Sequence, residues 1–259
     1  MADQKLGRVL KDKLLSGQSV YGTLIQNATT PAMVDFLPDN LLDFVIVSAE
    51  HNALDLADFL PLRYALANKG IACLARTHSR EPDDVSKVCD SFDGVVVPYV
   101  EDVQHAKRLA AAAVYRPLKG KALERVLNDG MWPSEETRKY IREKCDDTVF
   151  IPMIESVLGV ENVDEICSIP GVNALFIGPN DLTTNMGIPN QYDSPQLQTM
   201  IQRVIDAANR CHIAAGCWFG KPEQALRTKQ QGARLIVYSN DSSMLRDAIE
   251  LAFGRLRKT

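Results

Sequence analysis

Two acidic residues, Glu155 and Asp181, each follow an apolar run that is typical of a buried β-strand. The runs read Thr-Val-Phe-Ile-Pro-Met-Ile and Ala-Leu-Phe-Ile-Gly-Pro-Asn. An acid at the carboxyl end of a buried parallel strand contributes little to packing, and that end is where repeating β/α proteins build their sites. Carboxylate oxygens are suitable ligands for Mg²⁺ or Mn²⁺. The pair therefore predicts a divalent-cation site, with a helix N-cap as the alternative role for Asp181.

A guanidinium and an imidazole also follow predicted strands. Arg76 ends the run Ile-Ala-Cys-Leu-Ala-Arg, and His51 lies in Ser-Ala-Glu-His-Asn. Arg76 is suited to hold a substrate carboxylate or to offset the charge of an enolate oxygen, and equally to pair with an acid of the protein. His51 is suited to act as a general base near neutral pH, or to be a loop imidazole bonded to backbone. We predict both as catalytic residues, with these structural roles as the alternatives.

A helix opening follows the same strand as Asp181, at Gly178, Pro179, Asn180 and Asp181. Backbone N–H groups at a helix start attract an anionic group, such as a substrate carboxylate. Trp218 follows a later strand and would either line the same pocket or only pack. Together with Arg76, these residues form the predicted substrate-binding set.

Short β-rich runs alternate with helical patterns along the whole chain. Several runs are apolar at every position, which is typical of strands buried on both faces of a parallel sheet. Eight strands in 259 residues predict a (β/α)₈ barrel of the α/β class. No Gly-x-Gly-x-x-Gly follows the first strand, which disfavours a doubly wound open sheet. The predicted strands are Val20–Ile25, Phe44–Ser48, Ala72–Arg76, Gly94–Pro98, Val149–Ile154, Ala174–Gly178, Ile213–Cys217 and Arg234–Tyr238.

The segments between the strands complete this organisation. Helical patterns cover 55–67, 102–113 and 195–208, and another helix opens at Pro222. Residues 115–147 form the longest stretch without a clear pattern, and an insertion there could be a lid or an oligomer contact. No linker interrupts the chain, so we predict one domain over residues 1–259.

Composition excludes several classes of protein. The formal net charge is −4 and the Lys and Arg residues form no basic stripe, which argues against a nucleic-acid partner. No apolar run is long enough to span a membrane, and the N-terminus lacks the apolar core of a signal peptide. The six cysteines show no Cys-x-x-Cys spacing and are predicted to be reduced thiols, which favours a cytoplasmic location.

Four motifs in this order resemble the HpcH/HpaI aldolase and citrate lyase family over roughly residues 18–250. The most distinctive is Phe-Ile-Gly-Pro-Asn-Asp-Leu-Thr-Thr-Asn-Met-Gly at 176–187. The others are Glu50-His51, Leu74-Ala75-Arg76 and Ile154-Glu155-Ser156.

The resemblance implies a (β/α)₈ barrel in a homo-oligomer, a dimer or hexamer, with a helix near the C-terminus often exchanged between neighbours. It implies a small 2-oxo acid, pyruvate or oxaloacetate, handled as an enolate. Glu155 and Asp181 would bind the divalent cation, Arg76 would stabilise the enolate oxygen, and His51 would be the acid/base. The backbone from Pro179 to Asp181 would hold the oxo-acid carboxylate.

Three positions depart from the aldolase pattern. Ser48 replaces an Asp that forms a dyad with the histidine, Met153 replaces a Gln, and Leu-Lys-Gly-Lys-Ala at 118–122 replaces a Gly-x-Arg-Gly segment. Because the cation and enolate positions remain while substrate-handling positions differ, the resemblance favours a branch with altered chemistry. That branch is the citrate synthase of siderophore biosynthesis, which condenses oxaloacetate with acetyl-CoA.

The sequence therefore predicts an enzyme that makes or breaks a carbon–carbon bond next to a 2-oxo acid. Citrate synthesis is the favoured reaction. The alternative is a metal-dependent aldolase that releases pyruvate from a 4-hydroxy-2-oxo acid, and a related one is a CoA lyase that runs the citrate chemistry in reverse. A non-catalytic barrel with a binding role is the alternative from another class, motivated by Ser48.

Overall fold

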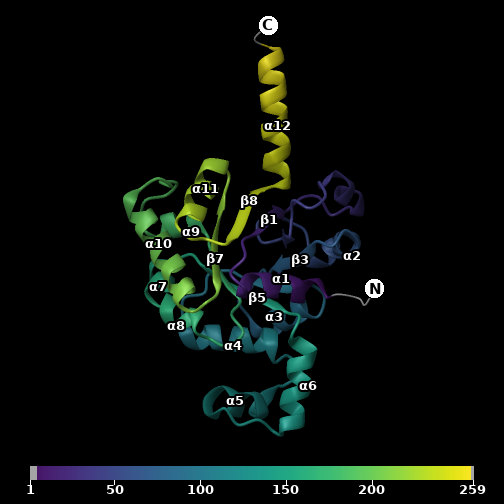
Figure 1. Ribbon diagram of the computed structural model, residues 1–259, viewed down its shortest axis with the longest axis vertical. Helices are drawn as coiled ribbons and strands as arrows, with labels where there is room; N and C mark the ends of the chain where they lie inside the picture. The colour runs from purple at the N-terminus through teal and green to yellow at the C-terminus, as the bar shows by residue number, and fades with distance from the viewer. Residues whose placement is uncertain (1–4, 258–259) are drawn as a thin grey trace.

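The computed structural model describes residues 5–257, in which eight parallel strands close into a barrel (Figure 1). Residues 1–4, part of the N-terminal segment predicted not to be a signal peptide, and residues 258–259 lie outside this range. Each strand pairs with its neighbours in sequence, and β1 pairs with β8, so the predicted (β/α)₈ barrel is confirmed. The strands are β1 Val20–Ile25, β2 Phe44–Ser48, β3 Ala72–Arg76, β4 Gly94–Val97, β5 Val149–Ile154, β6 Ala174–Ile177, β7 Ala214–Phe219 and β8 Leu235–Asn240.

Helices surround this barrel and join its strands (Figure 1). Two are short 3₁₀ helices, η1 Pro31–Phe36 and η2 Leu56–Phe59. The α-helices are α1 Leu6–Leu15, α2 Leu60–Asn68, α3 Pro82–Cys89, α4 Val103–Val114, α5 Gly120–Asp129, α6 Glu135–Cys145, α7 Val157–Glu161, α8 Val163–Cys167, α9 Pro179–Asn185, α10 Pro195–Arg210, α11 Pro222–Gln230 and α12 Asp241–Leu256.

Alternate residues of each strand serve two separate apolar layers. In β2, Phe44 and Ile46 belong to the cluster inside the barrel, whereas Val45 and Val47 pack between the strands and the helices. All four side chains are fully buried. Because both faces of the strand are dry, the sequence is apolar at every position rather than at alternate ones. The two layers leave the strand ends as the places where polar groups can lie.

Helix α1 closes the amino-terminal end of the barrel. Its Leu10 and Leu14 belong to the interior cluster. At Gly7 a Cβ would lie 2.1 Å from the carbonyl oxygen of Asp147 and 2.5 Å from that of Asp93, the residues that lead into β5 and β4. This close contact seals one end, so the carboxyl ends of the strands form the open mouth.

Residues 115–147 correct one sequence prediction. The stretch without a clear pattern contains the helices α5 and α6, which follow α4 and lie at the opposite end of the molecule from α9 and α11 (Figure 1). A lid over the mouth of its own barrel is therefore wrong for this segment. The strand predictions needed smaller corrections, because β7 and β8 each begin one residue later and end two residues later than predicted, and β4 and β6 each end one residue earlier.

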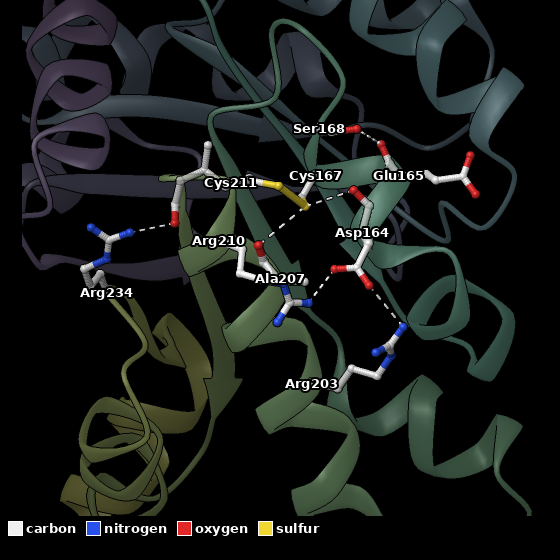
Figure 2. Close-up of a disulfide and its surroundings, with 10 residues drawn as sticks. Asp164, Glu165, Cys167, Ser168, Arg203, Ala207, Arg210, Cys211 and Arg234 are labelled. Carbon is white, nitrogen blue, oxygen red and sulfur yellow. Dashed lines mark hydrogen bonds and ion pairs between the residues drawn. A yellow bond between two sulfur atoms is a disulfide. The ribbon is translucent and has the colours of Figure 1, made fainter.

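A disulfide joins Cys167, at the end of α8, to Cys211, which caps the carboxyl end of α10 (Figure 2). Their Cα atoms lie 6.2 Å apart, within the usual range for a disulfide. Asp164 also pairs with Arg203 of α10. The prediction of six reduced thiols is wrong for these two cysteines, because only the packing of α8 on α10 brings residues 44 positions apart together. The other cysteines, Cys73, Cys89, Cys145 and Cys217, are free and buried.

Helix α12 extends away from the barrel, and none of its residues is buried (Figure 1). Its first residue, Asp241, accepts hydrogen bonds from the backbone N–H groups of Gln26, Asn27 and Ala28 at 3.2, 2.9 and 2.8 Å. These bonds fix the loop after β1 to the end of β8. Among the described residues, no helix is long and apolar enough to cross a membrane, and the cytoplasmic location stays a prediction.

Candidate active site

A cavity of about 280 Å³ opens at the mouth of the barrel, and every residue predicted for the site lines it. The side chains come from the ends of different strands, which the barrel brings to one place. Leu24, Met153 and Phe176 add apolar walls. The lining residues are Leu24, Gln26, His51, Arg76, Met153, Glu155, Phe176, Gly178, Pro179, Asn180, Asp181, Tyr192, Trp218 and Asn240.

Glu155 is the buried acid of this cavity, with 4% of its surface exposed. Its Oε2 accepts a hydrogen bond of 2.8 Å from the backbone N–H of Tyr99. Burial raises the pKa of Glu155 to about 7. The Tyr99 N–H opposes the rise, the Asp181 and Glu50 carboxylates add to it, and Arg76 opposes it. Near pH 7 the protonated and ionised forms of this carboxyl group are therefore both well populated when no cation is bound.

Gly178 leaves the space that the Glu155 carboxylate occupies. A Cβ at Gly178 would lie 2.1 Å from Glu155 Oε1 and 2.8 Å from its Cδ. Gly178 is also the N-cap residue of α9, and Pro179 is its first residue. Asp181 lies in the first turn of α9, half-buried and facing the cavity, so the alternative role of Asp181 as the N-cap is wrong.

Arg76 ends β3 with 7% of its surface exposed. Its Nε donates a hydrogen bond of 2.8 Å to Ser48 Oγ and lies 2.8 Å from Glu50 Oε2. Both roles considered for Arg76 thus have a structural basis, because the guanidinium pairs with an acid of the protein and also lines the cavity.

His51 lies at the rim, with 64% of its side chain exposed. Its Nε2 is 3.8 Å from Glu50 Oε2. Within residues 5–257 no backbone group bonds the ring, so the alternative of a loop imidazole bonded to backbone is wrong. The ring lines the cavity together with Arg76 and Asp181.

Trp218 and Tyr192 form further parts of the wall. Trp218 Nε1 donates a hydrogen bond of 2.9 Å to the carbonyl oxygen of Ser239, so this tryptophan both packs and lines the cavity. The hydroxyl of Tyr192 donates to Asn180 Oδ1 at 3.1 Å. Burial, followed by the Asp181 carboxylate, raises the pKa of Tyr192. Sequence reasoning missed Tyr192, because it lies in the loop after α9 rather than at a strand end.

The two acids fit a hard divalent cation. Within the part of the chain that the structure describes, no cluster of three or more His, Cys, Asp or Glu side chains could hold a metal. Mg²⁺ and Mn²⁺ commonly bind through one or two carboxylates, with water and substrate oxygens completing the coordination shell. Glu155 and Asp181 line one cavity, and the Asp181 carboxylate adds to the rise in the pKa of Glu155.

Comparison with known proteins places this barrel among carbon–carbon lyases. The family model for HpcH/HpaI aldolase/citrate lyase matches residues 24–248. The hydroxypyruvate/pyruvate aldolase of Chromohalobacter salexigens is 30% identical over 239 residues, which cover 90% of this chain and 92% of that protein.

Solved structures share the same barrel. The HpcH/HpaI aldolase from Desulfitobacterium hafniense superposes with a TM-score of 0.82 at 25% identity, over 96% of this chain and 97% of that one. The citrate synthase SbnG superposes with a TM-score of 0.79 at 23% identity, over 96% and 97% of the two chains, and this likeness concerns the fold alone.

Glu155 makes the stability of the metal-free protein depend on pH. Its pKa of about 7 lies above the ordinary value of 4.5, so the folded state binds this proton more tightly than the unfolded state. The resulting contribution to the free energy of unfolding is complete only below about pH 4.5. That contribution, about 3 kcal/mol, is lost as the pH rises through 7. In urea denaturation with EDTA, we expect Glu155→Gln to lack this loss. An identical pH dependence in wild type and variant would contradict the assignment.

Gly178→Ala should displace the Glu155 carboxylate, because the new Cβ would overlap Oε1. We expect the Kd for Mn²⁺, measured by calorimetry, to rise about tenfold or more. Gly220→Ala is the matched control, since a Cβ there meets its nearest atom at an ordinary 3.7 Å. Equal Mn²⁺ affinity in the two variants would show that Glu155 binds no cation.

Proposed function

Because the chain belongs to the HpcH/HpaI aldolase/citrate lyase family, we propose that it is a divalent-cation-dependent aldolase acting on a small 2-oxo acid. The observation that carries the proposal is the convergence of Arg76, His51, Glu155 and Asp181 on one cavity. The aldolase named above, which is similar over nine-tenths of this chain, supports the same class of reaction.

Each of these side chains has a separate role in an aldol cleavage. Glu155 and Asp181 would hold Mg²⁺ or Mn²⁺, which would supply polarisation of the carbonyl of the oxo acid. His51 accepts the proton of the 4-hydroxyl group, and the C3–C4 bond breaks. Its electron pair forms the C2–C3 double bond of an enolate while C4 becomes an aldehyde carbon. Arg76 offsets the charge on the enolate oxygen, and protonation of C3 gives pyruvate.

The remaining lining residues set the size and orientation of the substrate. The backbone from Pro179 to Asp181 would hold the oxo-acid carboxylate, and Trp218 lines the same cavity. Met153, which is 2% exposed, makes one wall apolar. A cavity of about 280 Å³ suits a short oxo acid rather than a long chain.

Citrate formation is the second candidate, and Ser48 is the observation that favours it. The buried hydroxyl of Ser48 accepts a hydrogen bond from Arg76, so no acid stands there to form a dyad with His51. In this reaction the methyl carbon of acetyl-CoA loses a proton and attacks C2 of oxaloacetate. Arg76 and the cation would hold that oxo acid. Water then cleaves the thioester, which gives citrate and free CoA thiol.

Two assays on one preparation test these reactions. With Mg²⁺ or Mn²⁺, we expect wild type to release pyruvate from a 4-hydroxy-2-oxo acid, and EDTA to abolish this activity. Arg76→Ala should lower kcat/KM by about 100- to 1000-fold, because an oxyanion-stabilising group is lost.

The parallel assay supplies oxaloacetate and acetyl-CoA and follows free thiol. Thiol release without pyruvate release would select citrate formation instead. A third outcome is that neither product forms and that the Arg76→Ala and Glu155→Ala variants match wild type in both assays. That outcome would leave a binding role for the barrel.

We further propose that the protein forms a homo-oligomer, a dimer or hexamer, in which copies exchange α12. An apolar groove of about 890 Å³ lies beside β1, η1 and β8, and its lining includes Met33, Phe36 and Ile236. On α12, Leu245, Ile249 and Phe253 recur every fourth residue and are 64%, 49% and 56% exposed. Such a stripe is typical of a helix that packs against another surface.

Phe253→Glu should weaken this association. A charge in the apolar stripe would have to be buried without a partner, so we expect light scattering after gel filtration to report a smaller species than for wild type. Gly254→Glu is the control, because a Cβ at that position meets no atom within 4 Å. A monomeric wild-type protein would contradict the exchange.

A further inference from the structure

We propose that Glu50 is a positioning residue for both Arg76 and His51, and that it supplies from position 50 the carboxylate that Ser48 does not provide. This inference rests on the proposed function, since it concerns how the same site is held. Glu50 was part of a sequence motif, but neither its residue type nor its spacing assigned it a role.

One oxygen atom of Glu50 lies between the two predicted catalytic side chains. Glu50 Oε2 is 2.8 Å from Arg76 Nε and 3.8 Å from His51 Nε2. Among the described residues this buried oxygen has no hydrogen-bond partner of good geometry. A buried carboxylate oxygen placed this way interacts with its neighbours mainly through its charge.

Ser48 orients the guanidinium but does not balance its charge. Its hydroxyl accepts hydrogen bonds from Arg76 Nε at 2.8 Å and from the backbone N–H of Glu50 at 3.4 Å. Arg76 is 7% exposed, and a cation with so little contact with water requires a counter-charge. A neutral hydroxyl cannot provide one, so the charge must come from a carboxylate nearby.

Glu50 can fill this role without competing with the cation site. If Arg76 had no acid of its own, the nearest alternatives around the cavity would be Glu155 and Asp181. A guanidinium paired with those acids would occupy the oxygens that are needed for Mg²⁺ or Mn²⁺. Glu50 therefore keeps Arg76 beside the cavity and leaves the acid pair free.

The Glu50 carboxylate also stabilises the charge on His51 during the reaction. The separation of 3.8 Å is too long for a hydrogen bond but within the range of an ion pair. When His51 accepts the substrate proton, its ring becomes positive, and Glu50 stabilises that charge at short range. The carboxylate of a catalytic dyad stabilises a protonated histidine in the same way.

Glu50→Gln tests the role, because it keeps the shape of the side chain and removes its charge. For the reaction that wild type catalyses, we expect the kcat of the variant to be about 10- to 100-fold lower, while KM changes by less than about threefold. Adding Ser48→Asp in that background should recover at least about tenfold in kcat, since it returns a carboxylate beside Arg76. Glu124→Gln, which changes an exposed side chain on α5, is the control and should match wild type.

A second readout does not depend on turnover. If Glu50 keeps Arg76 away from the acid pair, Glu50→Gln should raise the Kd for Mn²⁺ alone by about tenfold, measured by electron paramagnetic resonance. Glu50→Asp keeps the charge and should retain most of the affinity, which covers the case in which Glu50→Gln fails to fold. A wild type that binds Mn²⁺ but catalyses neither assayed reaction refutes the proposed function, and the Mn²⁺ comparison still decides the role of Glu50.

Two results would overturn the inference. One is a Glu50→Gln protein whose kcat and Mn²⁺ affinity both stay within about threefold of wild type. The other is a loss of kcat that Ser48→Asp does not restore at all, which would assign Glu50 to packing.

Discussion

The negative charge of Glu155, buried where β5 ends, is the constraint around which the barrel mouth is arranged. Glu155 has 4% of its surface exposed, and its Oε2 accepts a hydrogen bond from the backbone N–H of Tyr99. The chain must omit a side chain at Gly178 to make room for it. A fold accepts such a group only where a proton or a cation compensates it, because an uncompensated charge in a dry interior is costly.

The barrel places this charge by closing its two ends differently. Helix α1 seals the amino-terminal end through Leu10 and Leu14, while the carboxyl ends of the strands stay open. Residues far apart in sequence, such as Arg76 and Asp181, then share one cavity only because β3 and β6 belong to the same ring. The position of the site is thus a consequence of strand direction more than of any local motif.

The parts that sequence predicted are those with a local cause. Apolar runs such as Phe44–Ser48 mark strands because both faces are dry, and polar residues directly after them mark the mouth. What the sequence did not reveal depends on tertiary contact. The pairing of Cys167 with Cys211 needs α8 to pack on α10, and the place of Glu50 needs β2 and β3 side by side. Residues 115–147 escaped prediction for another reason, since α6 is largely polar and buries only Ile141 and Cys145.

Charge balance at the mouth connects these parts. Three carboxylates, those of Glu50, Glu155 and Asp181, stand against the guanidinium of Arg76, which leaves two negative charges when His51 is neutral. Without a cation, a proton on Glu155, whose pKa is about 7, can remove only one of these two charges. One divalent cation bound by Glu155 and Asp181, as proposed, would remove both charges and release that proton. The mouth would then be neutral before the proposed 2-oxo acid binds, and Arg76 would respond to the charge that develops during the reaction rather than to the charge of the protein itself.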